Sequence, residues 1–334
     1  MKFPRINFNY VFSSLKEFVK RHDRSRFFSR MYHYNILWFF WSRDRLKRNA
    51  KSTVRYDKIP YIIRRRHKNV GMFSYFNYIL SGIAYAEEKG YIPVVDMKNY
   101  PNTYLFPNEV GRVNSWEYYF EQPGGLSVDD ALSSQEYILG RDSVLNGGFG
   151  DFIRDKEALS RAREIRRKYI HFKQPVLERV EKTYKKFAGK RVLGVHIRGT
   201  DYVSIKLHGH PIQPTAEQTI SKTKEVMRDY NFDTVYLATE DKNIVADFQV
   251  AFGESLILPD IEYVDYDASK YKVIDEFHVD RENYKYLSGL DYVVSILLLS
   301  KCNGLIASPC NGTGSALFLS EGFEYFYMFR LGVY

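Results

Sequence analysis

The chain has 334 residues, a length that suggests two domains, and its 45% hydrophobic content is typical of a folded protein. The net charge of +9 is uneven, because residues 1–68 hold 19 Lys and Arg against 4 Asp and Glu, which leaves 30 basic and 36 acidic residues for the remainder. The body of the protein is therefore mildly acidic, which argues against a nucleic-acid partner, and its two cysteines cannot form a disulfide framework.

The N-terminal segment, residues 1–58, mixes basic and aromatic side chains and is interpreted as an extension. Its longest apolar run, Ile36–Trp41, is far shorter than the roughly 20 residues of a spanning helix, and no secretory signal opens the chain. A cytoplasmic location is expected. A basic aromatic segment favours peripheral attachment to the anionic inner face of a membrane. The alternative is that its aromatic residues pack on the body of the protein.

Residues 59–188 are predicted to form a first α/β domain and a helical connection. Ile59–Ile63 and Tyr91–Val95 read as strands, and the helical spacing of apolar residues in 76–89 predicts a helix between them. Residues 97–150 give no order of elements, whereas 155–188 are strongly helical and basic.

Residues 189–334 show the clearest alternation of strands and helices. The expected strands are Val192–Ile197, Thr234–Ala238, Leu256–Leu258, Gly304–Ala307 and Tyr325–Phe329, and the expected helices begin at Thr215, Asp241, Tyr284 and Gly312. Strands that are apolar on both faces and alternate with helices indicate a parallel sheet covered on both sides. Ligands of such sheets bind at the carboxyl ends of the strands.

Three of these strands end in polar motifs that together predict a nucleoside diphosphate site. After the first strand, His196 and Arg198 lie on the same face, and a guanidinium there can hold a phosphate through two hydrogen bonds. An Arg198–Asp201 pair of purely structural purpose is the alternative. The second strand ends in Glu240-Asp241, where helix capping competes with recognition of a guanine edge.

The third strand ends in Ser308-Pro309-Cys310-Asn311-Gly312-Thr313-Gly314. Small hydroxyl residues and glycines before a helix N-terminus favour a bound phosphate, although tight packing of the helix on the strand explains the glycines equally well. No Walker loop occurs in the chain, which argues against a P-loop phosphotransferase.

These motifs resemble those of the α1,2-, α1,6- and protein O-fucosyltransferases. His196-Ile197-Arg198-Gly199-Thr200-Asp201 is similar to their His-x-Arg-Arg-x-Asp element, in which the Thr and Asp match the α1,6 type and the rhizobial nodulation enzyme best. Val235–Asp241 resembles the second element, Leu297–Ala316 the third, and Gly71–Asn77 more loosely an N-terminal glycine–asparagine turn. The likeness covers roughly residues 190–320 well and 59–96 weakly.

The resemblance implies a GT-B fold with two Rossmann-like domains, 59–188 on the acceptor side and 189–334 on the nucleotide-sugar side. It implies an inverting transfer of fucose from GDP-fucose to a glycan or lipid-linked acceptor, with no metal and no cofactor besides the donor substrate. The residues expected at the donor, carried over by motif, are Arg198 on the β-phosphate, His196 and Asp241 near the guanine, and Ser308, Asn311 and Thr313 near the diphosphate or fucose.

Two departures from the family pattern leave parts of this assignment open. Gly199 replaces the second arginine, and Lys206 stands where the α1,6 enzymes carry their base. His210 is the first candidate for the base and Asp201 the second. Another donor such as GDP-mannose, and a non-catalytic membrane-surface protein, remain as alternatives.

Overall fold

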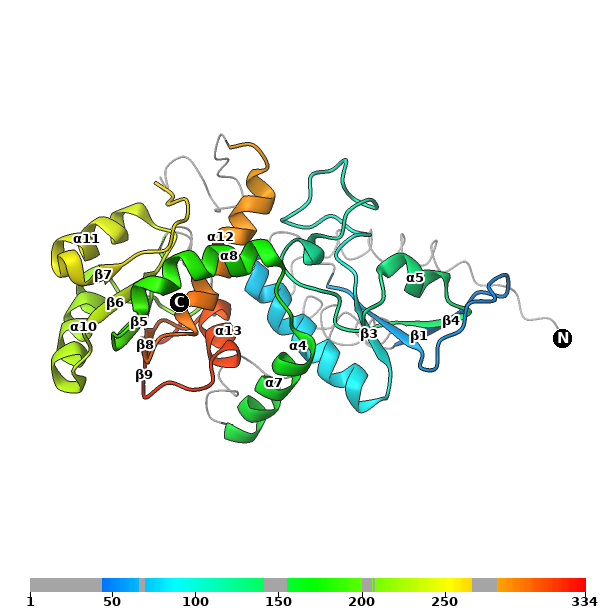
Figure 1. Ribbon diagram of the computed structural model, residues 1–334, viewed down its shortest axis with the longest axis horizontal. Coiled ribbons are helices and arrows are strands. Elements are labelled where there is room, and N and C mark those ends of the chain that lie inside the picture. Colours follow the sequence, from blue (N-terminus) through cyan, green and yellow to red (C-terminus); the bar gives the residue numbers. More distant parts are fainter. Residues whose placement is uncertain (1–43, 66–69, 141–154, 200–205, 207, 266–280) are drawn as a thin grey trace, which may run out of the picture.

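The computed structural model describes residues 44–65, 70–140, 155–199, 206, 208–265 and 281–334 (Figure 1). It is an α/β structure with two sheets, as predicted. The first sheet has the order β1-β4-β2-β3 and the second the order β7-β6-β5-β8-β9. Among the described residues, no helix is both long and apolar enough to cross a bilayer.

The first sheet is built on the strand–helix–strand unit that the sequence predicts. Its elements are β1 (Arg45–Arg48), β2 (Pro60–Ile63), α4 (Met72–Glu88), β3 (Ile92–Val95), α5 (Val128–Ser133) and β4 (Glu136–Leu139). Strand β2 pairs in parallel with β3 and with β4, and α4 connects β2 to β3. The carboxyl ends of these three strands therefore share one edge of the sheet.

Two strands of this sheet were not predicted. Strand β1 pairs antiparallel with β4, although it lies before residue 59, so the final part of the expected N-terminal extension belongs to the first sheet. All four residues of β1 are exposed, and three of them are basic, so no alternation of apolar residues marks it as a strand. The rest of the extension, residues 1–43, lies outside the described residues.

The second sheet follows the predicted order of elements, with ends that differ by one or two residues. Its strands are β5 (Val192–His196), β6 (Thr234–Ala238), β7 (Leu256–Ile257), β8 (Gly304–Ala307) and β9 (Tyr325–Met328), and its helices are α10 (Ala216–Tyr230), α11 (Lys242–Phe252), α12 (Tyr284–Leu299) and α13 (Asn311–Leu319). All neighbouring strands pair in parallel. A capping box starts α10 at the expected position, because Thr215 and Gln218 exchange side-chain to backbone hydrogen bonds of 3.1 and 3.0 Å.

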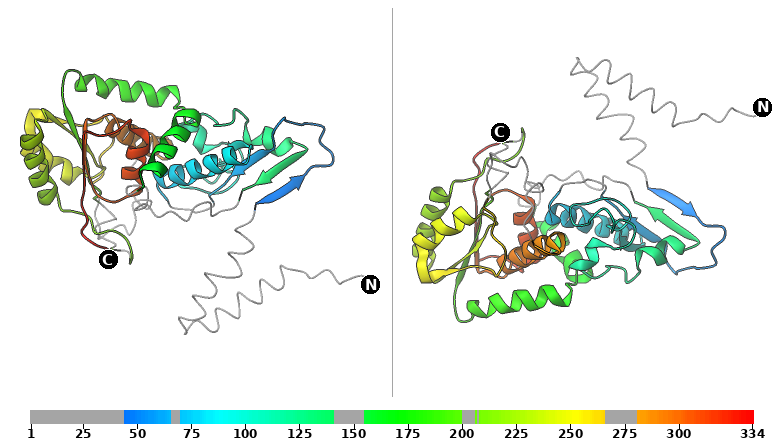
Figure 2. Two further views of the ribbon diagram at one scale, coloured as in Figure 1. Left: turned by 90° about the horizontal axis from the view of Figure 1, so that it is seen from below. Right: turned by 90° about the horizontal axis from the view of Figure 1, so that it is seen from above.

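Helices cover both faces of the second sheet. Leu193 and Val195 of β5 pack in a cluster with residues of α10 and α11, whereas Val192 points to the opposite face, which α12 covers. The cluster on that face continues through α13 and α4 into the first sheet. Phe73 of α4 meets Tyr292 of α12 edge to face, with ring centroids 4.9 Å apart. A packed helical layer therefore joins the two sheets (Figures 1 and 2).

The connection between the sheets consists of the predicted helices α7 (Lys156–Tyr169) and α8 (Gln174–Tyr184), followed by a short 3-10 turn at Lys185–Phe187. Two further 3-10 turns lie elsewhere, Ser115–Tyr118 before α5 and Gly253–Ser255 before β7. Arg163 and Arg166 of α7 donate through Nε to the carbonyl oxygens of Leu317 and Phe318, at 3.1 and 3.3 Å. These arginines satisfy carbonyl groups at the C-terminal end of α13 and fix that helix against the connection.

Candidate active site

The three polar strand ends meet at one edge of the second sheet. Strands β6, β5 and β8 are adjacent and parallel, with His196 paired in register with both Ala238 and Ala307. The segments that follow them therefore lie side by side: Ile197–Gly199, Thr239–Asp241, and Ser308–Cys310 with the start of α13. This convergence is what the carboxyl-end rule for parallel sheets anticipates.

A buried hydrogen-bond chain links the first and third strand ends. The Thr313 hydroxyl donates to the carbonyl oxygen of Ser308 at 2.6 Å, and the same hydroxyl lies 2.8 Å from Nδ1 of His196. Since the hydroxyl proton is used on Ser308, the Thr313 oxygen accepts from a protonated Nδ1. In the neutral ring, Nε2 is then the basic nitrogen. His196 and Thr313 are both buried, so they fix the turn before α13.

The Arg198 guanidinium lies between the first and second strand ends. Its Nη1 is 3.4 Å from Oε1 of Glu240, and its side chain is 14% exposed. Glu240 is the described partner of Arg198, whereas Asp201, the partner expected in the structural alternative, lies outside the described residues. A guanidinium is a planar fork of five N–H donors, a geometry that suits the oxygens of a phosphate.

Asp241 caps a helix, as one of the two readings of the Glu240-Asp241 pair expects. Its Oδ1 accepts from the backbone N–H of Asn243 at 2.9 Å and of Ile244 at 3.3 Å, at the start of α11. Gly199 packs directly against it, because a Cβ at residue 199 would overlap the Asp241 carboxylate and lie 2.7 Å from its Cβ. This contact leaves no room for a side chain at residue 199 in the described conformation. Recognition of guanine by Asp241 stays a prediction.

The N-terminus of α13 is held by a residue of the first sheet's helix. Asn77 of α4 donates through Nδ2 to the backbone oxygen and to Oδ1 of Asn311, both at 3.2 Å. Its Oδ1 accepts from the Ser315 hydroxyl at 2.6 Å. Gly312 allows the close approach, since a Cβ there would lie 2.7 Å from the Tyr292 hydroxyl oxygen and 2.8 Å from the His196 ring. The predicted phosphate cradle is thus shared between both halves of the chain.

Cys310, at the N-cap of α13, is a buried thiol of unusual acidity. Its Sγ lies 3.7 Å from Nδ1 of His196 and 3.6 Å from the Thr313 hydroxyl. Burial alone would raise the pKa of this thiol, but the His196 ring and the Arg198 guanidinium outweigh burial and lower the pKa to about 6. The same groups that stabilise a thiolate would stabilise another anion at this point.

Buried polar atoms near the third strand end that make no hydrogen bond within the described part of the chain include the Ser308 hydroxyl oxygen and Oε1 of Gln213. Nε2 of Gln213 donates to the carbonyl oxygens of Pro211 and Pro309 at 3.1 and 3.4 Å. A buried polar atom without a partner costs about 1–3 kcal/mol, so such atoms indicate where a ligand or water binds. Ser308 was predicted, whereas Gln213 was not.

Sequence reasoning also missed Asn77, Ser315, Tyr292 and Cys310 as parts of this arrangement. Tyr292, Asn77 and Ser315 act across helix contacts that no local pattern encodes. Cys310 stands in the glycine-rich motif before α13, but its thiol makes no capping hydrogen bond, and cysteine is not a typical capping residue.

Of the two candidate bases, His210 lies within the described residues. His210 is exposed, and its backbone oxygen accepts a hydrogen bond from the Tyr334 N–H at 3.0 Å. Three residues further along the chain, the Gln213 side chain donates to the carbonyl oxygen of Pro309. Asp201 lies outside the described residues. Within the described ranges, no group of three or more His, Cys, Asp or Glu side chains has the arrangement of a metal site.

No protein-family model matches the chain, and no curated protein matches it. Among solved structures, NodZ α-1,6-fucosyltransferase soaked with GDP-fucose shares 16% identity over 79% of this chain and 93% of its own, with a TM-score of 0.47. The structure of fucosyltransferase NodZ from Bradyrhizobium shares 15% identity over 78% of this chain and 93% of its own, with a TM-score of 0.46. POFUT1 in complex with GDP shares 11% identity over 80% of this chain and 98% of its own, with a TM-score of 0.45. At these identities and TM-scores the likeness does not establish an activity.

Proposed function

We propose that the chain is a glycosyltransferase of the GT-B type that transfers fucose from GDP-fucose, with inversion, to a glycan or lipid-linked acceptor. The observation that carries the proposal is the convergence of Arg198, the N-terminus of α13 and the unpartnered Ser308 hydroxyl at the carboxyl edge of a parallel sheet. A guanidinium, helix-terminal N–H groups and a free hydroxyl are complementary to a diphosphate. The sequence resemblance supplies the choice of guanosine and fucose.

The chemistry of such a transfer assigns a role to each group. The acceptor oxygen forms a bond to the anomeric carbon while the bond from that carbon to the β-phosphate oxygen breaks. The electron pair stays on the departing GDP, and the acceptor proton passes to a base. Arg198 and the α13 N-terminus oppose the negative charge that develops on the β-phosphate, without having to reorganise. His210 and Asp201 are the proposed bases, on the side of the sugar opposite the diphosphate.

The test uses nucleotide binding, because it needs no acceptor. GDP and GDP-fucose at 100 times their dissociation constants should stabilise the fold by about 2.7 kcal/mol, with UDP-sugars giving no shift. EDTA should leave the shift unchanged. GDP-mannose serves as the competing donor. A shift with UDP-sugars and none with guanine nucleotides would overturn the donor assignment.

Arg198→Ala should weaken GDP binding by about 10- to 100-fold, since hydrogen bonds between charged groups contribute about 1.5–3 kcal/mol. Arg198→Lys should recover only part of this affinity, because an ammonium lacks the planar fork of donors. Arg228→Ala is the matched control, as that arginine pairs with Asp229 on the outer helix α10. Equal GDP affinities for Arg198→Ala and Arg228→Ala would exclude the phosphate role.

A further inference from the structure

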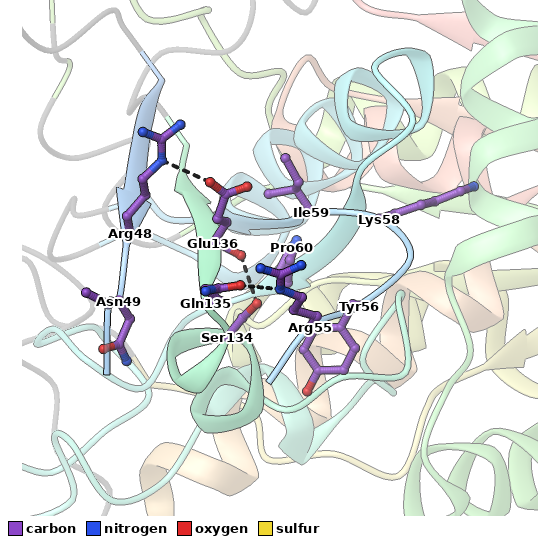
Figure 3. A pocket seen from close by; sticks show the side chains of 11 residues that line it. Arg48, Asn49, Arg55, Tyr56, Lys58, Ile59, Pro60, Ser134, Gln135 and Glu136 are labelled. Carbon is purple, nitrogen blue, oxygen red and sulfur yellow. Dashed lines mark hydrogen bonds and ion pairs between the residues drawn. The ribbon is translucent and has the colours of Figure 1, made fainter. Parts of the chain in front are cut away.

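A separate cavity lies at the edge of the first sheet where β2 and β4 begin. Its volume is about 440 Å³, and Figure 3 shows the side chains that line it: Arg48, Asn49, Ala50, Arg55, Tyr56, Lys58, Ile59, Pro60, Ser134, Gln135 and Glu136. These residues stand where β2 and β4 begin and where the antiparallel β1 ends. The start of α4, beyond the carboxyl end of β2, packs on Tyr292 at the candidate active site. The cavity therefore belongs to a different face of the protein.

The wall of the cavity is a loop that folds back on β4. Gln135 accepts a backbone hydrogen bond from Asn49 and donates one to Val54, both at 2.8 Å. The Ser52 hydroxyl adds a bond to the carbonyl oxygen of Ser133 at 2.5 Å and accepts from the Val54 N–H at 3.1 Å. Four hydrogen bonds thus fix the loop that leads to Arg55.

The charges of the cavity do not balance. Arg48 donates through Nε to Oε1 of Glu136 at 2.9 Å, so this pair is neutral overall. Arg55 donates through Nε to the side-chain oxygen of Gln135, an uncharged amide, which leaves its positive charge uncompensated. Within the described ranges, neither Arg55 nor Lys58 forms an ion pair with a carboxylate. The cavity therefore carries an excess of two positive charges.

The remaining lining determines the kind of anion that fits. With Nε engaged on Gln135, the terminal N–H groups of Arg55 remain as a fork of donors, which matches the oxygens of a phosphate group (Figure 3). Pro60 and Ile59 supply an apolar wall, and Tyr56 adds an aromatic side chain to the lining. A cavity of this volume with charged and apolar walls accommodates a phosphate attached to an organic group better than a bare ion.

We propose that this cavity is a second binding site, specific for a phosphate ester, in which Arg55 and Lys58 hold the phosphate group. The ester comes either from a soluble sugar or polyol phosphate or from the headgroup of an anionic phospholipid. Both sources present the same phosphate oxygens to Arg55. The site is separate from the proposed nucleotide site, because the cavity lies at the amino ends of β2 and β4 in the first sheet, whereas the nucleotide site lies at the carboxyl ends of β5, β6 and β8 in the second sheet.

The experiment compares the full-length protein with Arg55→Gln, Lys58→Gln and, as a matched control, Lys47→Gln. Lys47 is an exposed cation of β1 that does not line the cavity, so its replacement removes the same charge from the same region. Calorimetric titration with glycerol 3-phosphate tests the soluble source. Sedimentation with phosphatidylcholine vesicles that contain phosphatidylglycerol tests the lipid source, since that headgroup is also a glycerol phosphate.

We expect Arg55→Gln and Lys58→Gln to weaken binding in at least one arm by 10-fold or more, and Lys47→Gln to leave it within about 2-fold. Loss in the soluble arm identifies a soluble ester, and loss confined to vesicles identifies a lipid headgroup. Equal losses for Lys47→Gln and Arg55→Gln would show a general effect of surface charge and overturn the proposal. Absence of binding in both arms at about 10 mM phosphate, where even a millimolar site is filled, would overturn it as well. Circular dichroism of each variant confirms that it is folded.

Discussion

The hydrogen bonds of Asn77 make a quantitative prediction about how the two halves of the chain are coupled. Asn77→Ala removes the bond from the Ser315 hydroxyl and both bonds to Asn311. Each net hydrogen bond contributes about 0.5–1.5 kcal/mol, so the loss of three should lower the free energy of unfolding by roughly 1.5–4.5 kcal/mol. Ser315→Ala removes one bond of 2.6 Å and should cost about 1 kcal/mol.

The pair is tested by a double-mutant cycle. If the Ser315–Asn77 bond forms as described, the double variant should be less destabilised than the sum of the two single variants, by about 1 kcal/mol. The free energies come from urea unfolding of all four proteins, compared at a common slope. Ser81→Ala is the control, because its hydroxyl bonds only to the Asn77 backbone oxygen, at 2.8 Å within α4. Its effect should add to that of Ser315→Ala. A coupling below about 0.3 kcal/mol between Asn77 and Ser315 would refute the contact between α4 and α13.

Three further predictions concern the strand ends of the second sheet. The rate of alkylation of Cys310 by iodoacetamide should rise with pH to a plateau, with a midpoint near pH 6, because the thiolate is the nucleophile and the pKa of this thiol is lowered to about 6. A midpoint above pH 8 would contradict this electrostatic account. Gly199→Ala should destabilise the fold by about 1–3 kcal/mol, because the new methyl group overlaps Asp241, and adding Asp241→Gly should restore part of this stability. Urea unfolding that shows no change in stability for Gly199→Ala would contradict the contact. Asp241→Ala should lower the free energy of unfolding by about 1 kcal/mol and Asp241→Asn by much less, because an asparagine also caps a helix. Equal losses of stability for the two variants in thermal unfolding would exclude capping as the reason.

The second sheet was predictable because its strands carry a strong local signal. Val192–His196 and Thr234–Ala238 are buried along their whole length, and each is followed by a helix with a recognisable start. Parallel strands buried on both faces are continuous apolar runs, and their carboxyl ends must share an edge. The meeting of His196, Arg198 and Ser308 at one edge follows from these two facts alone.

The first sheet was predicted only in part, because its strand β1 carries no local apolar signal. Strand β1 is an exposed edge strand of basic residues, and its pairing with β4 depends on a partner about 90 residues away. Charged side chains on an edge strand protect it from pairing with another chain, which is the feature that hides it from a search for apolar alternation. The cavity that contains Arg55 was hidden with it, since the loop that forms its wall is fixed by backbone bonds to Gln135.

Gly199 stands where the element that the sequence resembles has a second arginine, and the structure shows what the glycine contacts. In the sequence it is a missing arginine, and it weakens the functional assignment. In the structure, the backbone at 199 packs against Asp241, the residue that caps α11, so any side chain at 199 competes with the cap. The ends of β5 and β6 are therefore coupled through backbone contact, which leaves Arg198, with Glu240 as its described partner, as the cation that this strand end presents. An arginine at 199 would have to displace the Asp241 carboxylate first, and the start of α11 would lose its cap.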